Sequence, residues 1–482
     1  MEIETVKIQK VNEAYNRIVA DAGIIQELSD YFTFEVPGAK FSPAYRNRLW
    51  DGKIRLLNSL TCLLYSGLSD HLESFCKSRN YAVEYEGIDA DYELSLVEAN
   101  EFIEKLNPKH QPREYQIAAF LHAVRKRRGL LLSPTASGKS LIIYLLTCWY
   151  AKKTLIIVPT TSLVHQMASD FEDYGFPKDS IHKIMSGLEK DSNRLIFCST
   201  WQSIYKMPKA WFDQFEVVIG DEAHLFKSKS LISIMTNLAN CKHRFGFTGT
   251  LDGSQTHKLV LEGLFGPVKR VITTADLIEQ KHLADFKIKA IVLCYPDAIK
   301  QLNSKNDYQA EIDLIVRSEA RNRFIKNLVL SLKGNTLLLF QYVDKHGKVL
   351  YDMIQKEAVD RQVYFISGSV DGEKREEIRR LLEEQKDAIV VASFGTTSTG
   401  INIRNLHNVV FASPSKSRVR NLQSIGRGLR KSATKTEATL YDIADDLTWK
   451  SKKNYTILHF IERIKVYNEE KFPYKIYNVS LN

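Results

Sequence analysis

Residues 133–140 read Ser133-Pro134-Thr135-Ala136-Ser137-Gly138-Lys139-Ser140, directly after the apolar run 129–132. A strand that turns tightly into a helix presents backbone N–H groups that can surround an anion at the helix N-terminus. We expect Lys139 to add positive charge at the β- and γ-phosphates of a nucleotide, and the Ser140 hydroxyl to bind Mg²⁺. The loop residues 134–138 are then expected to contact the phosphates.

Two loop positions depart from the general phosphate-binding pattern. Ser133 stands where that pattern has glycine, and Ala136 replaces a glycine often found in the middle of such loops. Gly138 remains, so a tight turn is still predicted.

The alternation of short apolar runs with amphipathic segments predicts an α/β fold with parallel sheets. From about residue 100 to 285 the expected strands are 129–132, 154–158, 195–198, 216–219 and 245–247. A second set is expected at 336–340, 362–366, 388–391, 408–411 and 439–441. Two similar lobes, 101–285 and 286–482, are therefore predicted, with a helix between residues 447 and 474 closing the second. Residues 1–100 are aromatic-rich and are expected to form a small N-terminal α+β domain.

Composition narrows the class of protein. The chain has 482 residues, long enough for roughly three domains, and 67 basic against 57 acidic side chains give a net charge of +10. This excess favours a polyanionic partner. The six cysteines are scattered without a Cys-x-x-Cys pair, there is no secretory signal pattern, and no apolar run approaches the about 18 residues of a membrane span. We expect a cytoplasmic protein that does not contact membranes.

A pair of carboxylates follows the apolar run 217–219. Asp221 is the candidate Mg²⁺ ligand, and Glu222 is the candidate general base for a water molecule near the γ-phosphate. His224 lies two residues further on and is a weaker candidate by itself. Taken alone, an Asp-Glu pair at a strand end is equally typical of a solvated turn.

Three side chains near the end of the second lobe form another candidate group. Gln423, Arg427 and Arg430 are spaced to share one face of a helix expected to start near residue 418. Guanidinium groups on such a face could neutralise charge that develops on a γ-phosphate, which is the role of an arginine finger. A basic, solvated helix is the alternative interpretation.

Together these residues resemble the motifs of superfamily 2 helicases, and the resemblance extends over residues 105–445. It implies two RecA-like lobes that bind ATP and Mg²⁺ and grip a nucleic-acid strand. It places Arg113 and Gln116 at the adenine, Gly400 at the nucleotide, and Thr248 and Thr250 in the motif that couples hydrolysis to movement. The strand-binding residues implied by the resemblance are Pro159, Thr160, Thr200, Gln202, Ser367, Gly368 and Thr396.

The substrate is a separate question, because the Asp-Glu-Ala-His tetrad at 221–224 occurs in DNA and RNA enzymes alike. Residues 247–251, 264–267 and 275–278 look like those of DNA repair and restriction translocases, and the whole chain resembles the recombination helicases of T-even phages. That resemblance implies unwinding of branched DNA, including Holliday junctions, replication forks and R-loops that contain RNA, in recombination, repair and replication restart. We expect the protein to be a monomer. It also implies strand annealing and contacts with recombination or single-strand-binding proteins. An RNA helicase, or an ATP-gated clamp that anneals strands without unwinding, remain as alternatives.

A basic and aromatic cluster within residues 40–55 bears on the same question. The candidate nucleic-acid contacts are Lys40, Arg46, Arg48, Trp50 and Lys53, interleaved with Phe41 and Tyr45. Such a cluster would bind phosphates in a salt-sensitive way and could stack on a base or wedge into a fork, so we expect it to contact duplex DNA ahead of the motor. A small hydrophobic core with a basic rim fits the same residues equally well.

Overall fold

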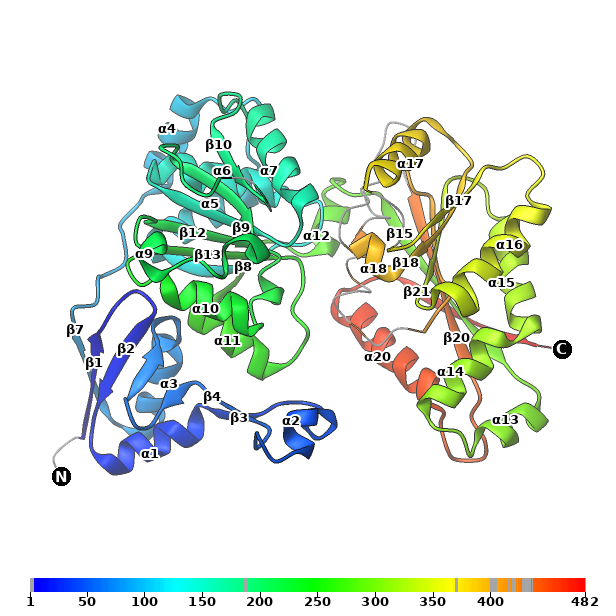
Figure 1. The fold of residues 1–482 in the computed structure, drawn as a ribbon, viewed down its shortest axis with the longest axis horizontal. Coiled ribbons are helices and arrows are strands. Elements are labelled where there is room, and N and C mark those ends of the chain that lie inside the picture. The colour runs from blue at the N-terminus through cyan, green and yellow to red at the C-terminus, as the bar shows by residue number, and fades with distance from the viewer. Residues whose placement is uncertain are drawn as a thin grey trace. The chain divides into compact units, whose positions relative to one another are not determined.

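The computed structural model describes residues 4–185, 187, 189–368, 372–398, 405–414, 417, 422, 424–426, 435 and 437–481. They form two compact units (Figure 1). One unit consists of Met1–Ser133 and Gly138–Val271, and the other of Pro134–Ser137 and Ile272–Asn482. Within the described ranges, every helix is too short or too polar to span a bilayer.

The N-terminal domain contains a five-stranded sheet and two longer helices: β1 Thr5–Lys10, β2 Tyr15–Val19, α1 Ala22–Tyr31, β5 Leu57–Asn58, β6 Leu63–Tyr65, η2 Ser66–Leu68, α3 Ser69–Arg79 and β7 Ala82–Glu86. The strand order is β5-β6-β2-β1-β7, with β1 antiparallel to β2 and parallel to β7. In β1 the side chains of Val6 and Ile8 are buried, while those of the residues between and beside them are not, as expected for a sheet with one covered face.

A hairpin extends from this domain. Its strands β3 (Thr33–Glu35) and β4 (Lys53–Arg55) are antiparallel, and η1 (Ala39–Phe41) and α2 (Pro43–Arg46) lie between them. We call residues 36–52 the arm. Figure 1 shows the arm projecting away from the five-stranded sheet.

The N-terminal domain and the first lobe share one hydrophobic core. A single cluster of buried side chains runs from Val6 and Phe32 to Leu264 and Phe265. The two parts also approach closely, because a Cβ atom on Gly67 would overlap the backbone carbonyl of Glu262. The N-terminal domain therefore packs directly against the first lobe.

The first lobe is a seven-stranded sheet with order β10-β11-β9-β12-β13-β8-β14, in which every described pairing is parallel. Strand β9, at Thr154–Val158, is buried along its whole length, as expected for a strand covered by helices on both faces. The other strands are β8 Arg128–Leu132, β10 Ile181–Ile184, β11 Ile196–Thr200, β12 Val217–Asp221, β13 His243–Thr248 and β14 Val268–Arg270. The helices are α4 Leu96–Leu106, α5 Glu114–Lys126, α6 Lys139–Tyr150, α7 Thr161–Tyr174, α8 Trp201–Ile204, α9 Lys209–Phe212, η3 Ala223–Leu225, α10 Lys229–Asn237 and α11 Gln255–Phe265.

The second lobe repeats this architecture with strand order β17-β18-β16-β19-β20-β15-β21, again with every described pairing parallel. Its strands are β15 Asp285–Cys294, β16 Thr336–Phe340, β17 Val363–Ile366, β18 Ile389–Ser393, β19 Asn408–Phe411, β20 Glu437–Asp446 and β21 Tyr474–Ser480. The helices are α13 Asp297–Asn303, α14 Tyr308–Arg317, α15 Glu319–Ser331, η4 Val343–Gly347, α16 Lys348–Glu357, α17 Gly372–Glu384, α18 Phe394–Ser398 and α20 Tyr455–Glu469, and α12 Thr274–Glu279 precedes β15. The predicted α/β fold with two RecA-like lobes and a small N-terminal domain is confirmed.

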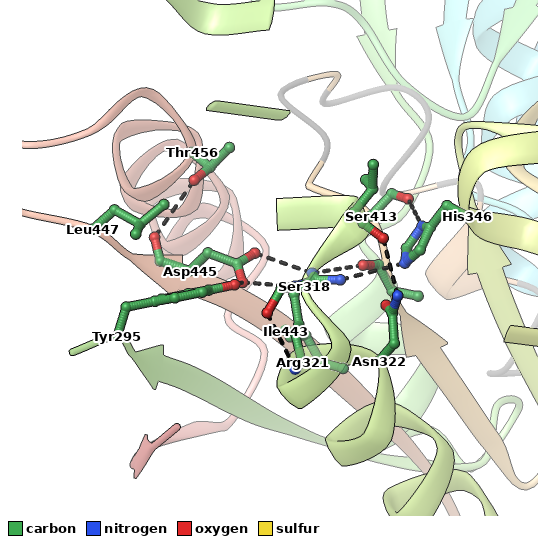
Figure 2. Close-up of polar contacts among 12 residues, drawn as sticks. Tyr295, Ser318, Arg321, Asn322, His346, Ser413, Ile443, Asp445, Leu447 and Thr456 are labelled. Carbon is green, nitrogen blue, oxygen red and sulfur yellow. Dashed lines mark hydrogen bonds and ion pairs between the residues drawn. The ribbon is translucent and has the colours of Figure 1, made fainter. Parts of the chain in front are cut away.

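A buried ion pair joins α15 to β20 in the second lobe (Figure 2). The Arg321 guanidinium donates to both carboxylate oxygens of Asp445, at 2.7 and 3.0 Å, and to the Ala412 carbonyl at 2.7 Å. The Tyr295 hydroxyl donates to the same carboxylate at 2.9 Å. Both charged side chains are inaccessible to solvent, so their charges are balanced entirely inside the lobe.

Candidate active site

Three neighbouring strands of the first lobe deliver the candidate ATPase residues. Strand β13 pairs in parallel with β12 on one side and with β8 on the other. Their carboxyl ends therefore lie along one edge of the sheet, where parallel α/β sheets bind ligands. Residues 133–140 follow β8, residues 221–224 end and follow β12, and residues 248–250 end and follow β13.

The loop between β8 and α6 depends on its glycine. Gly138 has φ +76°, in the left-handed region, and a Cβ atom there would overlap the side-chain amide of Gln116. That amide donates to the Gly138 carbonyl at 3.3 Å, and its oxygen accepts from the Arg113 backbone N–H at 2.8 Å. The predicted adenine element is thus in direct contact with the end of the predicted phosphate loop.

Ala136 also has a left-handed backbone, with φ +67°. This conformation costs an L-residue roughly 1–2 kcal/mol relative to the right-handed region, a cost that glycine does not carry. Alanine in place of glycine at this position therefore carries a cost in backbone strain.

A chain of polar contacts links Lys139 to the predicted coupling motif. The Lys139 Nζ atom lies 3.9 Å from Glu222 Oε1, and His224 Nδ1 lies 3.4 Å from Glu222 Oε2. His224 Nδ1 is also 3.0 Å from Thr248 Oγ1, which donates to the Thr250 carbonyl at 2.9 Å. Residues from three separate motifs therefore form one continuous polar path.

The Asp221 carboxylate lies beside these groups at the end of β12. Burial, and then the charge of Glu222, raise its pKa to about 6. Such a carboxylate would be stabilised by a cation, and hydroxyl and carboxylate oxygens such as those of Ser140 and Asp221 are ligands that suit Mg²⁺. No group of three or more acidic, histidine or cysteine side chains in the described ranges could hold a metal alone. Phosphate oxygens and water would complete the shell, as is usual for Mg²⁺.

Sequence reasoning missed one contact at this site. The hydroxyl of Tyr174, the last residue of α7, lies 2.7 Å from Ser140 Oγ. The only local signal is Gly175, which ends the helix with φ +110°, and nothing in the sequence connects that helix end to the phosphate loop.

The candidate nucleic-acid-binding residues of the first lobe lie at or just after the carboxyl ends of the adjacent strands β9 and β11. Thr160 is the N-cap of α7, with its hydroxyl accepting from the Leu163 N–H. Thr200 is buried and its hydroxyl lies 3.0 Å from Ser203 Oγ, whereas Gln202 is exposed. Pro159 directly follows β9.

In the second lobe, Ser367 and Gly368 follow β17, and Thr396 follows the adjacent strand β18. Ser367 and Thr396 are buried, Gly368 is exposed, and the Thr396 hydroxyl is hydrogen-bonded to Ser393. Four predicted residues of this lobe lie outside the described residues: Gly400, Gln423, Arg427 and Arg430.

The arm exposes the basic and aromatic cluster. Phe41 is 67% exposed and Tyr45 41% exposed, so neither ring belongs to a closed core. Trp50 is less exposed and its indole N–H donates to the Lys53 carbonyl at 2.8 Å. The basic side chains of the cluster that are exposed are those of Lys40, Arg46, Arg48 and Lys53.

Known proteins resemble this chain in sequence and in fold. The chain is 38% identical over 504 residues to the ATP-dependent DNA helicase uvsW of Enterobacteria phage T4, and the match covers 99% of this chain and 100% of that protein. This chain belongs to the UvsW family of superfamily 2 helicases. The crystal structure of T4 UvsW matches with a TM-score of 0.52 and 36% identity, covering 99% of this chain and 100% of that one.

Three family descriptions match successive parts of this helicase. Residues 5–86 match the N-terminal region of DNA helicase UvsW, residues 109–253 match the type III restriction enzyme res subunit, and residues 320–432 match the helicase conserved C-terminal domain. A more distant relative is the DNA 3'-5' translocase XPB2 of Sulfurisphaera tokodaii, 23% identical over 359 residues, covering 68% of this chain and 80% of that protein.

Proposed function

We propose that this helicase hydrolyses ATP with Mg²⁺ to unwind branched DNA during recombination, repair and replication restart, with strand annealing as an associated activity. In this proposal residues 1–100 form an accessory nucleic-acid-binding domain. Residues 101–285 are the first RecA-like lobe, and residues 286–482 are the second.

The proposed chemistry uses the polar path of the first lobe. Lys139 would neutralise charge on the β- and γ-phosphates, and Glu222 would accept a proton from the attacking water. Bound Mg²⁺, held by Ser140 and Asp221, would shield the phosphate charge. The contact between His224 and Glu222 would hold that carboxylate in place, because the imidazole lies between it and Thr248.

We further propose that Thr248 and Thr250 carry the state of the γ-phosphate to the strand-binding residues. The Thr248 hydroxyl contacts His224 on one side and the Thr250 carbonyl on the other. A shift of Glu222 would therefore move His224 and, through Thr248, the backbone that follows β13. The remaining roles are proposed from the sequence. Arg113, Gln116 and Gly400 would contact the nucleotide, and Gln423, Arg427 and Arg430 would form the arginine-finger group. The residues proposed to contact the nucleic-acid strand are Pro159, Thr160, Thr200, Gln202, Ser367, Gly368 and Thr396.

The exposed arm is the observation that supports a branched substrate. Rings that remain open to solvent beside four exposed basic side chains suit contacts with unpaired bases next to a phosphate backbone. Unpaired bases and a duplex phosphate backbone occur together where duplex DNA and single strands meet.

The substrate is tested by comparing ATPase rates on single-stranded DNA, duplex, four-way junction and RNA of equal nucleotide concentration. We expect the junction to stimulate hydrolysis most strongly. Strong stimulation by single-stranded RNA, with no response to junctions, would show that the enzyme acts on RNA instead.

The role of the arm is tested with substitutions, because deletion of the whole N-terminal domain would expose the core that it shares with the first lobe. Phe41→Ala should weaken junction binding by roughly 1–3 kcal/mol if the ring stacks on a base. Leu49→Ala is the matched control, since Leu49 is 81% exposed on the same arm but has no aromatic ring. Equal junction affinities for the two variants would contradict stacking by Phe41.

A further inference from the structure

The ring of Tyr174 is held in place beside the phosphate loop by contacts on two sides. Its centroid lies 5.5 Å from that of Tyr144 on α6 and 5.8 Å from that of His110, in edge-to-face arrangements. Its hydroxyl, at the far end of the ring, reaches Ser140 Oγ at 2.7 Å. The ring is thus fixed by packing, and the hydroxyl by this hydrogen bond.

The same helix end also anchors the segment that leads into the adenine element. The Tyr174 carbonyl accepts from the Lys109 backbone N–H at 3.2 Å. The preceding residue, Asp173, accepts from Lys109 Nζ at 2.8 Å and lies 2.9 Å from His110 Nε2. The end of α7 therefore contacts both the proposed metal ligand and the chain just before Arg113.

A serine hydroxyl has one proton and two lone pairs, so the partner of its proton decides where its lone pairs point. When such a hydroxyl binds a cation, its proton is the part left for a neighbouring acceptor. Partners of this kind orient metal ligands, and their loss typically costs about 10- to 100-fold in metal affinity. The phenol oxygen of Tyr174 carries lone pairs and lies within hydrogen-bond distance of Ser140 Oγ, so it can accept this bond.

We infer that Tyr174 is a positioning residue for metal-bound nucleotide: its hydroxyl oxygen accepts the proton of Ser140 and directs a Ser140 lone pair towards Mg²⁺. This inference rests on the proposed role of Ser140 as a metal ligand. It adds a residue from α7 to a site otherwise built from the ends of β8, β12 and β13.

The test is the binding of a non-hydrolysable ATP analogue by the full chain, measured by calorimetry without Mg²⁺ and across a Mg²⁺ titration. Tyr174→Phe keeps the packed ring and removes only the hydroxyl. We expect its metal-free affinity to stay within about twofold of the parent, and the Mg²⁺ concentration for half-maximal tight binding to rise about tenfold. Tyr144→Phe is the matched control, because it removes a neighbouring hydroxyl that bonds to Cys148 and not to Ser140; it should titrate like the parent.

Ser140→Ala separates failure of this inference from failure of the proposed site. If Ser140→Ala keeps the full Mg²⁺ response, Ser140 is not a metal ligand and the proposed metal site is wrong. If Ser140→Ala loses that response while Tyr174→Phe titrates like the parent, or binds Mg²⁺ more tightly, the role of Tyr174 is overturned. In the double variant, Tyr174→Phe should have no further effect, since the two residues act through one bond; an additive loss would also overturn the inference.

Discussion

The Lys139 ammonium lies 3.9 Å from the Glu222 carboxylate, although one residue begins α6 and the other follows β12. Each group is only partly exposed, so each charge is felt by the other more strongly than across open solvent. The side chain proposed to bind phosphate and the side chain proposed to activate water therefore influence each other electrostatically.

Replacing Lys139 with alanine should abolish ATP turnover. The variant loses the positive charge proposed for the β- and γ-phosphates, and loss of one such group typically lowers kcat by about 100- to 1,000-fold. Phosphate release in the presence of DNA measures this. Lys152→Ala, which breaks only an exposed ion pair with Glu216, should turn over like the parent.

Glu222→Gln should separate hydrolysis from binding. Glutamine keeps the size of the side chain but cannot accept the proton of the attacking water, so we expect turnover to fall by about 100- to 10,000-fold. Affinity for a non-hydrolysable analogue should be retained. Hydrolysis at the parental rate would show that Glu222 is not the base.

Asp221→Asn should stabilise the metal-free protein at pH 7. The pKa of Asp221 is raised from 3.8 to about 6, so the native state binds more protons than the unfolded state between these values, and its stability falls as pH rises across that window. At pH 7 the full cost of the buried charge is present, and the substitution should recover up to about 3 kcal/mol. Thermal melts at pH 7 and pH 4 check this, because the gain should disappear at the lower pH. A gain of equal size at both pH values would contradict the electrostatic cause.

For Arg427→Ala we expect hydrolysis to fall by about 1,000-fold or more while nucleotide affinity is largely kept, as for an arginine finger. Single-turnover hydrolysis and analogue binding, measured on the same preparation, distinguish the two effects. A defect confined to affinity would speak against this role.

The buried pair of the second lobe should matter far more to stability than an exposed pair on the same sheet. Asp445→Ala leaves the Arg321 guanidinium without its carboxylate, and removal of one partner from a buried pair typically costs about 3–5 kcal/mol. Glu437→Ala breaks an exposed pair with Lys287 and should cost less than about 1 kcal/mol. Urea unfolding of the two variants compares them directly; equal midpoints would show that the buried network is not stabilising.

The strands that the sequence predicts well are the ones buried on both faces. The runs at 154–158, 336–340 and 408–411 coincide with β9, β16 and β19, because central parallel strands are almost wholly apolar. The sequence does not predict the edge strand β21, because most of its residues are exposed and its place depends on pairing with β15. The helix predicted at 447–474 is shorter in the structure, where α20 spans Tyr455–Glu469.

The residues of the candidate site also differ in how well the sequence predicts them. Motif residues that follow apolar strands, such as Lys139 and Glu222, are recognisable because the strand and its polar end are adjacent in sequence. Tyr174 was not predicted, because its proximity to Ser140 arises from the packing of α7 against α6 and has no local signature.

The continuous core between the N-terminal domain and the first lobe limits how this enzyme can be re-engineered. A chimaera that takes its first 86 residues from a relative must also match the surface of α11, where Gly67 leaves no space beside Glu262 and the Tyr65 ring faces Gly263. In such a chimaera the N-terminal domain, with its arm, and the first lobe should therefore be taken from the same protein.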